Sequence, residues 1–137
     1  MGFNMKIGLL FSGQGAQQVG MGSDLYEALP VYRETIDQAS EILGYDLATV
    51  VQDEAKIFQT QYAQPAILAM SVGIVKALGE RLPPPVASLG LSLGEYSALT
   101  VAGAFSFAQS VAIIKDRGAY MQAVGDKNPG KMVAVMG

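Results

Sequence analysis

The stretch ASLGLSLGEYSALTVAG, residues 87–103, restricts the possible folds more than any other part of the chain. An apolar run, Val86–Leu89, precedes a Gly-x-Ser-x-Gly pattern at Gly90–Gly94, and a helix-like segment follows. In a nucleophile elbow, a serine occupies such a strand-to-helix turn, and small flanking residues let the chain segments pass closely. The motif alone can arise by chance in a glycine-rich sequence, but its context favours Ser92 as a nucleophile.

The base that such a serine needs is missing. The sequence has 137 residues, with no histidine and no cysteine. A serine nucleophile usually depends on a neighbouring base, most often histidine. Ser92 is therefore either a structural residue, or its base lies outside this sequence. Without histidine or cysteine the usual zinc sites are excluded as well. We expect neither a metal nor a redox cofactor.

The remaining hydrophobic pattern predicts an α/β fold, with a parallel sheet and helices on both faces. Lys6–Phe11 is a nearly continuous apolar run, which is typical of a strand buried on both faces. Lys131–Gly137 resembles a third strand. The spacing of apolar residues, prolines and glycines predicts helices over residues 23–29, 30–43, 65–82, 93–102 and 106–124, with a helical turn at 46–52 and mostly connection at 53–63.

Capping residues set the ends of these predicted helices. Pro65 is expected to open the long apolar helix, which should lie buried between layers because its apolar positions run nearly all the way round. Ser106 and Gln109 form a capping-box pattern at the start of the last helix. Gly44 and Gly125 are expected to end the helices that precede them.

Gly13–Gln17 forms a second glycine-rich turn, directly after the first predicted strand. The third glycine of a dinucleotide fingerprint is replaced by Gln18, and no P-loop lysine follows, so both nucleotide-binding interpretations are weak. The alternative is a loop at the end of a strand, where ligands bind in open α/β sheets. Such a loop can give the second amide donor of an oxyanion hole, the first coming from the elbow.

Arg117 lies near the apolar stripe of the last predicted helix, three residues after Ile114. An arginine in such a position is costly unless it pairs with an anion. The alternative is a surface arginine whose stem covers apolar residues, and the residue pattern alone leaves both open.

Four segments together resemble the malonyl-CoA:acyl carrier protein transacylase family and, more widely, the acyltransferase domains of fatty acid and polyketide synthases. They are FSGQGAQQVGMG at 11–22, YAQPAIL at 62–68, GLSLGEYSAL at 90–99 and RGAYMQ at 117–122. Their order and spacing match the family over nearly the whole chain. The resemblance implies a partial α/β-hydrolase-like subdomain over 1–127, and the first strand of a truncated ferredoxin-like insert over 128–137.

The resemblance also implies roles for individual residues. Ser92 matches the nucleophile that takes the acyl group, and Arg117 matches the arginine that binds the free carboxylate of malonate. The backbone amides of Gln14 and Leu93 match the oxyanion hole, and Gln64 and Met121 would line the substrate pocket. Leu91 replaces a histidine that commonly precedes the serine in this family. The family's catalytic base is a different histidine far downstream, so we expect an N-terminal half that is inactive alone.

The function implied is transfer of malonate from malonyl-CoA to the phosphopantetheine thiol of acyl carrier protein, without a cofactor, in the cytoplasm. The alternatives are an acyltransferase domain of a polyketide synthase, and a truncated non-catalytic fragment that binds acyl-CoA or a partner. The net charge of −3 gives no indication of a nucleic-acid surface, and no uninterrupted apolar run predicts a membrane span.

Three structural expectations follow from these assignments. Ser92 should have a positive φ angle, with its flanking glycines packed against backbone. Arg117 should point toward the Ser92 hydroxyl. The 132–136 strand should be detached from the main sheet, and apolar surface should be exposed around the strand that precedes Ser92.

Overall fold

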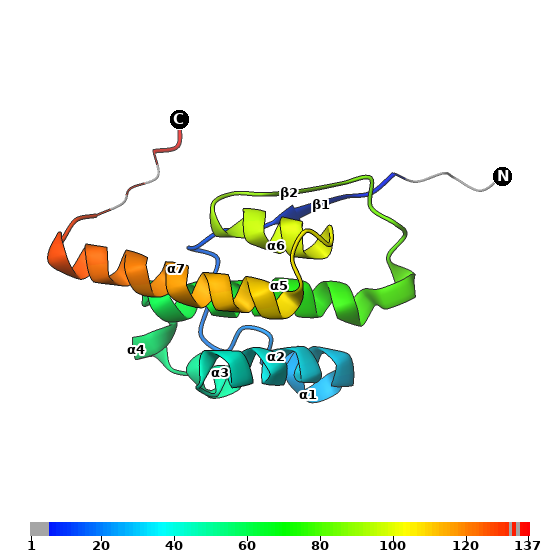
Figure 1. Ribbon diagram of the computed structural model, residues 1–137, viewed down its shortest axis with the longest axis horizontal. Coiled ribbons are helices and arrows are strands. Elements are labelled where there is room, and N and C mark those ends of the chain that lie inside the picture. Colours follow the sequence, from blue (N-terminus) through cyan, green and yellow to red (C-terminus); the bar gives the residue numbers. More distant parts are fainter. Residues whose placement is uncertain (1–5, 132, 134) are drawn as a thin grey trace.

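The computed structural model describes residues 6–131, 133 and 135–137. Its elements stack in layers (Figure 1). A small sheet lies at one side, α6 (Leu93–Val101) lies against it, and α5 (Thr60–Leu78) and α7 (Phe107–Lys127) form the next layer. The far layer contains the helices between β1 and α5, which are α1 (Ser23–Ala28), α2 (Pro30–Leu43), α3 (Leu47–Val50) and α4 (Glu54–Ile57).

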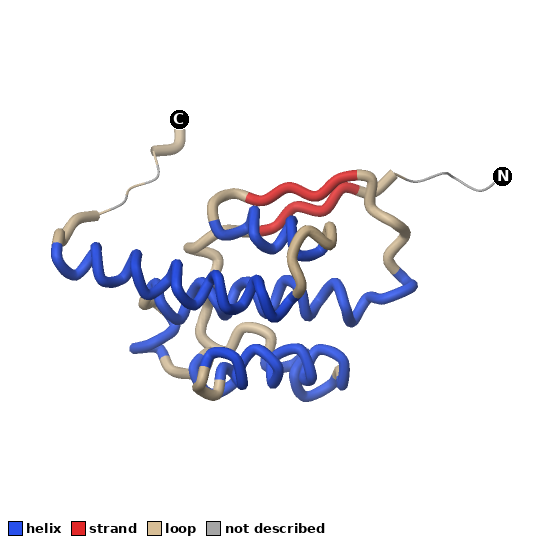
Figure 2. Tube along the Cα trace, viewed as in Figure 1, coloured by secondary structure: helices blue, strands red, loops and turns tan. Residues whose placement is uncertain are grey.

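The sheet consists of two parallel strands, β1 (Gly8–Phe11) and β2 (Ala87–Gly90), with Gly8 opposite Ala87 and Phe11 opposite Gly90. Parallel pairing confirms the predicted fold class. The helices of the described chain lie on one side of these strands only (Figure 2), so the prediction of helices on both faces was wrong.

One face of the sheet is therefore open. Side chains alternate between the two faces of a strand, and the outward-facing Leu10 and Leu89 are 81% and 63% exposed. The prediction that the first strand is buried on both faces was wrong for the same reason, since nothing in the described chain covers its outer face. The predicted apolar exposure next to the Ser92 turn is confirmed.

Helix α5 forms the centre of the core, as the all-round apolar pattern predicts. It packs against α2, α6 and α7, and Leu68 and Ala69 are fully buried. By length and composition alone the helical stretch Thr60–Arg81, which includes the short 3-10 helix η1 (Gly79–Arg81), could cross a membrane. Half of the most apolar part of this stretch is nevertheless buried inside the molecule, as in the core helix of a globular protein.

The start of α5 corrects the sequence prediction. The helix begins at Thr60, and Pro65 lies inside it rather than opening it, while α4 occupies part of the segment predicted to be connection. A proline removes the hydrogen bond to the residue four positions earlier, here Gln61, at a place where tertiary packing is close. A Cβ on Gly118 of α7 would lie 3.1 Å from the Gln61 Cα. This packing holds the helix start in spite of the lost bond.

The sequence predicts the start of α7 correctly but not its end. Ser106 and Gln109 form the expected capping box. Gly125, however, does not end the helix, which continues to Lys127 because an isolated glycine costs a helix only about 1 kcal/mol. The predicted strand over 131–137 includes Met132 and Ala134, which lie outside the described residues. Its described residues are not part of a strand.

Candidate active site

Ser92 lies on the tight turn between β2 and α6, with φ 55° and ψ −112°. Among the described residues it is the only non-glycine residue with a positive φ, which confirms the expected strained turn. A Cβ on Gly90 would overlap the backbone carbonyl of Gly94, and a Cβ on Gly94 would overlap the carbonyl oxygen of Phe11. Both glycines are therefore required for the close approach of β1, β2 and α6.

Arg117 projects from α7 toward this turn, as expected. Its Nη2 donates a hydrogen bond to the Ser92 Oγ at 3.1 Å, and its guanidinium carbon lies 5.5 Å from the centre of the Tyr96 ring. The side chain is half-buried, and no carboxylate within the described residues forms an ion pair with it. The geometry therefore excludes the alternative of a surface arginine that points into solvent, and leaves a positive charge beside the serine hydroxyl.

Gln64 connects Arg117 to the neighbouring groups, although it is fully buried. Its Oε1 accepts a hydrogen bond from Arg117 Nη1 at 2.6 Å, and its Nε2 donates to Gln14 Oε1 and to the Met121 Sδ, each at 3.2 Å. The amide therefore has partners at both of its ends. Gln64 is expected to line the substrate pocket, and in the structure it is fully buried directly behind Arg117. Met121 is 42% exposed and remains accessible.

The two amides expected to form an oxyanion hole lie on either side of the turn. Leu93 is the first residue of α6, where the amide nitrogens have no partner within the helix. The Gln14 loop lies against the turn, since a Cβ on Gly13 would lie 2.7 Å from the Leu91 carbonyl oxygen and 4.0 Å from the Ser92 Cβ. In the described part of the chain, neither the Gln14 nor the Leu93 amide nitrogen has a hydrogen-bond acceptor.

Sequence reasoning missed two residues that contact this cluster. Thr60 Oγ1 accepts a hydrogen bond from Gln14 Nε2 at 2.9 Å, and the Thr60 amide donates to Gln122 Oε1 at 2.9 Å. Gln122 lies one helical turn after Gly118, on the side of α7 that packs against α5. The i, i+4 spacing of Gly118 and Gln122 indicates that both lie on the same side of α7. It points to Thr60 only if α5 is known to begin at Thr60, which the sequence prediction did not place.

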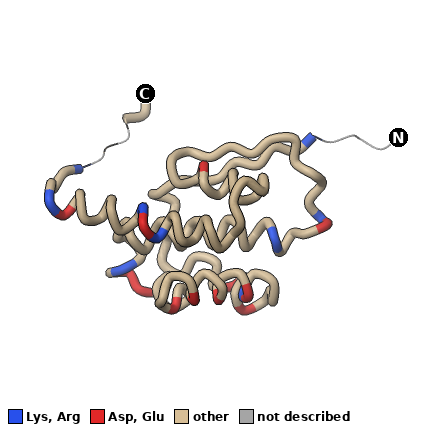
Figure 3. The backbone as a smooth tube through the Cα atoms, in the orientation of Figure 1, with Lys and Arg blue, Asp and Glu red and all other residues tan. Residues whose placement is uncertain are grey.

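The charges are distributed unevenly around the site (Figure 3). Carboxylates gather on the layer of α1 to α3, whereas β1 and β2 carry no charged residue, and Glu95 is the acidic residue in the first turn of α6, after Ser92. Lys115 is held against α2, because its Nζ donates to the Ile42 carbonyl oxygen at 3.1 Å. Arg117 thus brings a positive charge within 3.1 Å of the Ser92 Oγ, on the side of the molecule away from the acidic layer.

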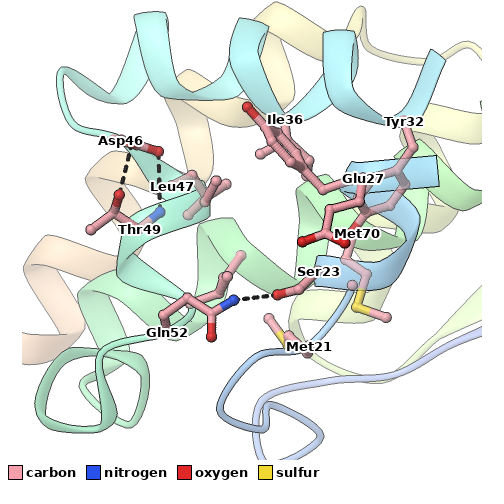
Figure 4. A pocket seen from close by; sticks show the side chains of 15 residues that line it. Met21, Ser23, Glu27, Tyr32, Ile36, Asp46, Leu47, Thr49, Gln52 and Met70 are labelled. Atoms are coloured by element: carbon pink, nitrogen blue, oxygen red, sulfur yellow. Dashed lines mark hydrogen bonds between the residues drawn. The ribbon is translucent and has the colours of Figure 1, made fainter. Parts of the chain in front are cut away.

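A cavity of about 360 Å³ lies elsewhere, between α1, α2, α3 and α5 (Figure 4). Gln52 donates to Ser23 at its edge, and Asp46 accepts bonds from Thr49. Burial, with a smaller contribution from Asp24, raises the pKa of the lining Tyr32 to about 12. No lysine or arginine lines this cavity, so it does not suit a carboxylate, and neither Ser92 nor Arg117 reaches it. Across the described residues, no group of three or more acidic side chains could hold a metal ion.

The chain is similar to known proteins over most of its length. A family described as acyl transferase domain matches residues 9–137. A malonyl CoA-acyl carrier protein transacylase of Haemophilus influenzae is 41% identical over 136 residues, which cover 96% of this chain and 44% of that protein.

Two solved structures are also similar. One from Streptococcus pneumoniae, titled MCAT, has a TM-score of 0.81 at 52% identity and covers 85% of this chain and 38% of that chain. The other, titled as a type II PKS acyl-carrier protein in complex with its malonyl-transacylase, has a TM-score of 0.82 at 41% identity and covers 87% and 40%. This chain therefore spans about two fifths of the length of its relatives.

Proposed function

The chain belongs to the acyl transferase domain family, and on that premise we propose that it carries the nucleophile and the carboxylate-binding arginine of a serine malonyltransferase. The proposed reaction moves malonate from malonyl-CoA to the phosphopantetheine thiol of an acyl carrier protein. The observation that carries this proposal is the contact between the strained Ser92 and Arg117, at 3.1 Å from Nη2 to Oγ.

In the proposed first half-reaction, the Ser92 Oγ attacks the thioester carbon of malonyl-CoA, and its proton passes to a base. The carbonyl oxygen becomes an oxyanion, which accepts hydrogen bonds from the Gln14 and Leu93 amides. The C–S bond then breaks, coenzyme A leaves as the thiol after taking up the proton, and malonate remains as an ester on Ser92. In the second half, the carrier protein's thiol attacks this ester and restores the serine hydroxyl.

Arg117 gives the proposed selectivity. A guanidinium binds a carboxylate with two parallel hydrogen bonds, which fixes both the position and the orientation of the malonyl group. Gln64 orients Arg117 through the 2.6 Å bond to Nη1, and Met121 lies beside it as an apolar contact for the substrate. When malonate occupies the site, its carboxylate displaces the Ser92 hydroxyl from Nη2 and so frees the hydroxyl for attack.

The base of this reaction lies outside these 137 residues in our proposal, since the sequence contains no histidine. We further propose that residues 1–127 form part of an α/β-hydrolase-like subdomain, and that 128–137 begin a ferredoxin-like one. The chain alone should then acylate slowly and fail to turn over. The proposed chemistry uses side chains and backbone amides only, and needs no metal or redox cofactor. A cytoplasmic location remains our prediction.

The proposal is tested by incubating the chain with malonyl-CoA, with and without imidazole as an external base, and measuring the intact mass. We expect slow addition of one malonyl group to Ser92, accelerated by imidazole and abolished in Ser92→Ala. Acetyl-CoA should react less, because it has no carboxylate for Arg117. Absence of malonylation in imidazole, or equal labelling of Ser92→Ala, would refute the nucleophile assignment.

The second candidate is an acyltransferase of polyketide synthesis, which the similarity to the complex with a type II polyketide carrier protein favours. The malonylated chain, isolated and mixed with carrier proteins of the fatty acid and the polyketide type, distinguishes the two by which carrier removes the label. A non-catalytic fragment would instead bind malonyl-CoA in calorimetry without forming any covalent adduct.

A further inference from the structure

We infer that Thr60 and Gln122 are positioning residues, which hold the Gln14 loop in the orientation that oxyanion stabilisation requires. This inference rests on the proposed function. It concerns two side chains that support the Gln14 loop: Thr60 bonds to Gln14, and Gln122 bonds to Thr60. Neither has a hydrogen bond to Ser92 in the described structure. The positioned group is the backbone amide of Gln14.

The side chain of Gln14 is fixed at both ends. Its Nε2 donates to Thr60 Oγ1 at 2.9 Å, and its Oε1 accepts from Gln64 Nε2 at 3.2 Å. A planar carboxamide that is bonded through both its oxygen and its nitrogen has a defined orientation. Because both partners belong to the first two turns of α5, the core helix determines where this side chain lies.

Thr60 is itself fixed by α7. It is the first residue of α5, where an amide lacks a partner within the helix, and Gln122 Oε1 accepts from that amide at 2.9 Å. Gln122 is held in turn through its Nε2, which donates to Asp126 at 2.9 Å. Gly118 allows α7 to come this close, since a Cβ there would lie 3.3 Å from the Thr60 carbonyl oxygen.

The loop needs this support because its own backbone is permissive. Gln14 is exposed and lies between two glycines, and Gly15 has a φ of 109°, a conformation that glycine adopts readily. Amide donors stabilise an oxyanion strongly only when they are oriented before the reaction begins. Within the loop, the Gly15 amide donates to Gln17 Oε1 at 2.7 Å, and the two side-chain bonds of Gln14 tie the loop to α5. Of the two partners on α5, Thr60 is the one that α7 holds in place.

The experiment uses Thr60→Val, which removes the hydroxyl and keeps the shape, together with Thr60→Ser, which restores the hydroxyl. Thr49→Val is the matched control, because the Thr49 hydroxyl is also hydrogen-bonded, to Asp46, but lies on α3 away from the site. Malonylation of Ser92 in imidazole is followed over a range of malonyl-CoA concentrations.

We expect Thr60→Val to lower the maximal rate of malonylation about tenfold or more, short of the 10²–10³ lost when an oxyanion donor is removed outright. The half-saturating concentration should change less than about twofold, because the oxyanion forms only in the transition state. Thr60→Ser should recover the rate, and Thr49→Val should match the unchanged chain. A merely structural Thr60 would leave the maximal rate of the folded protein unaltered, and that result would overturn the inference.

Amide NMR spectra of the same ¹⁵N-labelled proteins give a readout independent of activity. Thr60→Val should shift the backbone amide signals of Gln14 and Gly15, whereas Thr49→Val should leave them in place. If the unchanged chain is not malonylated at all, the proposed function fails, but these spectra still decide whether Thr60 holds the loop. Unmoved Gln14 and Gly15 signals in Thr60→Val would refute the inference by themselves.

Discussion

Replacing Ser92 by glycine should stabilise the folded chain relative to replacing it by alanine. Ser92 has φ 55° and ψ −112°, a combination that a residue with a Cβ adopts only under strain. Glycine adopts positive φ without that penalty, whereas alanine keeps it. Both substitutions remove the hydroxyl that accepts a hydrogen bond from Arg117, so the loss of that bond cancels when the two variants are compared.

The magnitude of the difference follows from two opposing terms. A residue held in a sparsely populated backbone region costs roughly 1–3 kcal/mol. Glycine also makes the unfolded chain more flexible, which destabilises the folded state by about 0.4–1 kcal/mol relative to alanine. The net expectation is that Ser92→Gly is about 1 kcal/mol more stable than Ser92→Ala. In a chain of this length that difference raises the melting temperature by roughly 3–5 °C.

The assay is reversible urea unfolding followed by circular dichroism, with the melting temperature measured in parallel. The relevant quantity is the difference in midpoint between the two variants at equal slope, because an altered slope would report a change in the unfolded state. Ser92→Gly no more stable than Ser92→Ala would show that the turn is unstrained. The argument for an elbow would then rest on the packing of Gly90 and Gly94 alone.

The remaining predictions concern Arg117 as the carboxylate-binding residue, the close packing of Gly90 against backbone, and the buried Tyr32. Arg117→Ala should raise the barrier to malonylation of Ser92 by roughly 2–5 kcal/mol and leave acetylation in imidazole nearly unchanged. Equal losses for both substrates in a competition assay would contradict the assignment of Arg117 as the residue that binds the malonate carboxylate. Gly90→Ala should destabilise the chain by about 3 kcal/mol or prevent folding, because its Cβ would overlap backbone, whereas Gly125→Ala, with open space around it, should stabilise the chain by about 0.5–1 kcal/mol in urea unfolding. Burial raises the pKa of Tyr32 to about 12, so between about pH 10 and 12 the unfolded chain loses a proton that the folded chain keeps, and stability falls as the pH rises. Tyr32→Phe should make that fall shallower in urea midpoints, and an identical pH profile would show that Tyr32 does not contribute to it.

The Ser92 turn was predictable from sequence because its requirements are local. A strained serine needs a strand before it, a helix after it and two glycines that permit close packing, and all of these lie within residues 86–102. The direction of Arg117 was predictable only through the resemblance to a family. Its position near an apolar stripe fitted a surface arginine equally well, and the bonds that settle its direction come from Gln64, far away in the sequence.

The errors arose where distant parts of the chain decide local structure. Pro65 is a normal helix-opening signal, but packing of α7 against Gln61 extends α5 back to Thr60. That shift hid the contacts of Thr60 with Gln14 and Gln122. The open face of the sheet was not predictable from the strands either, since the apolar side chains Leu10 and Leu89 are typical of strands with both faces covered.

The parallel pairing of β1 with β2 also determines the order in which this molecule can form. Most of the chain, including α1 to α5, lies between the two strands, so their pairing closes a long loop and carries the corresponding entropy cost. Contacts between residues close in sequence form faster than such long-range pairs. Because Ser92 directly follows β2, the nucleophile turn is completed only when this long-range pairing has formed. The reactive geometry is therefore tied to a contact between distant parts of the chain, and it is lost when the two strands separate.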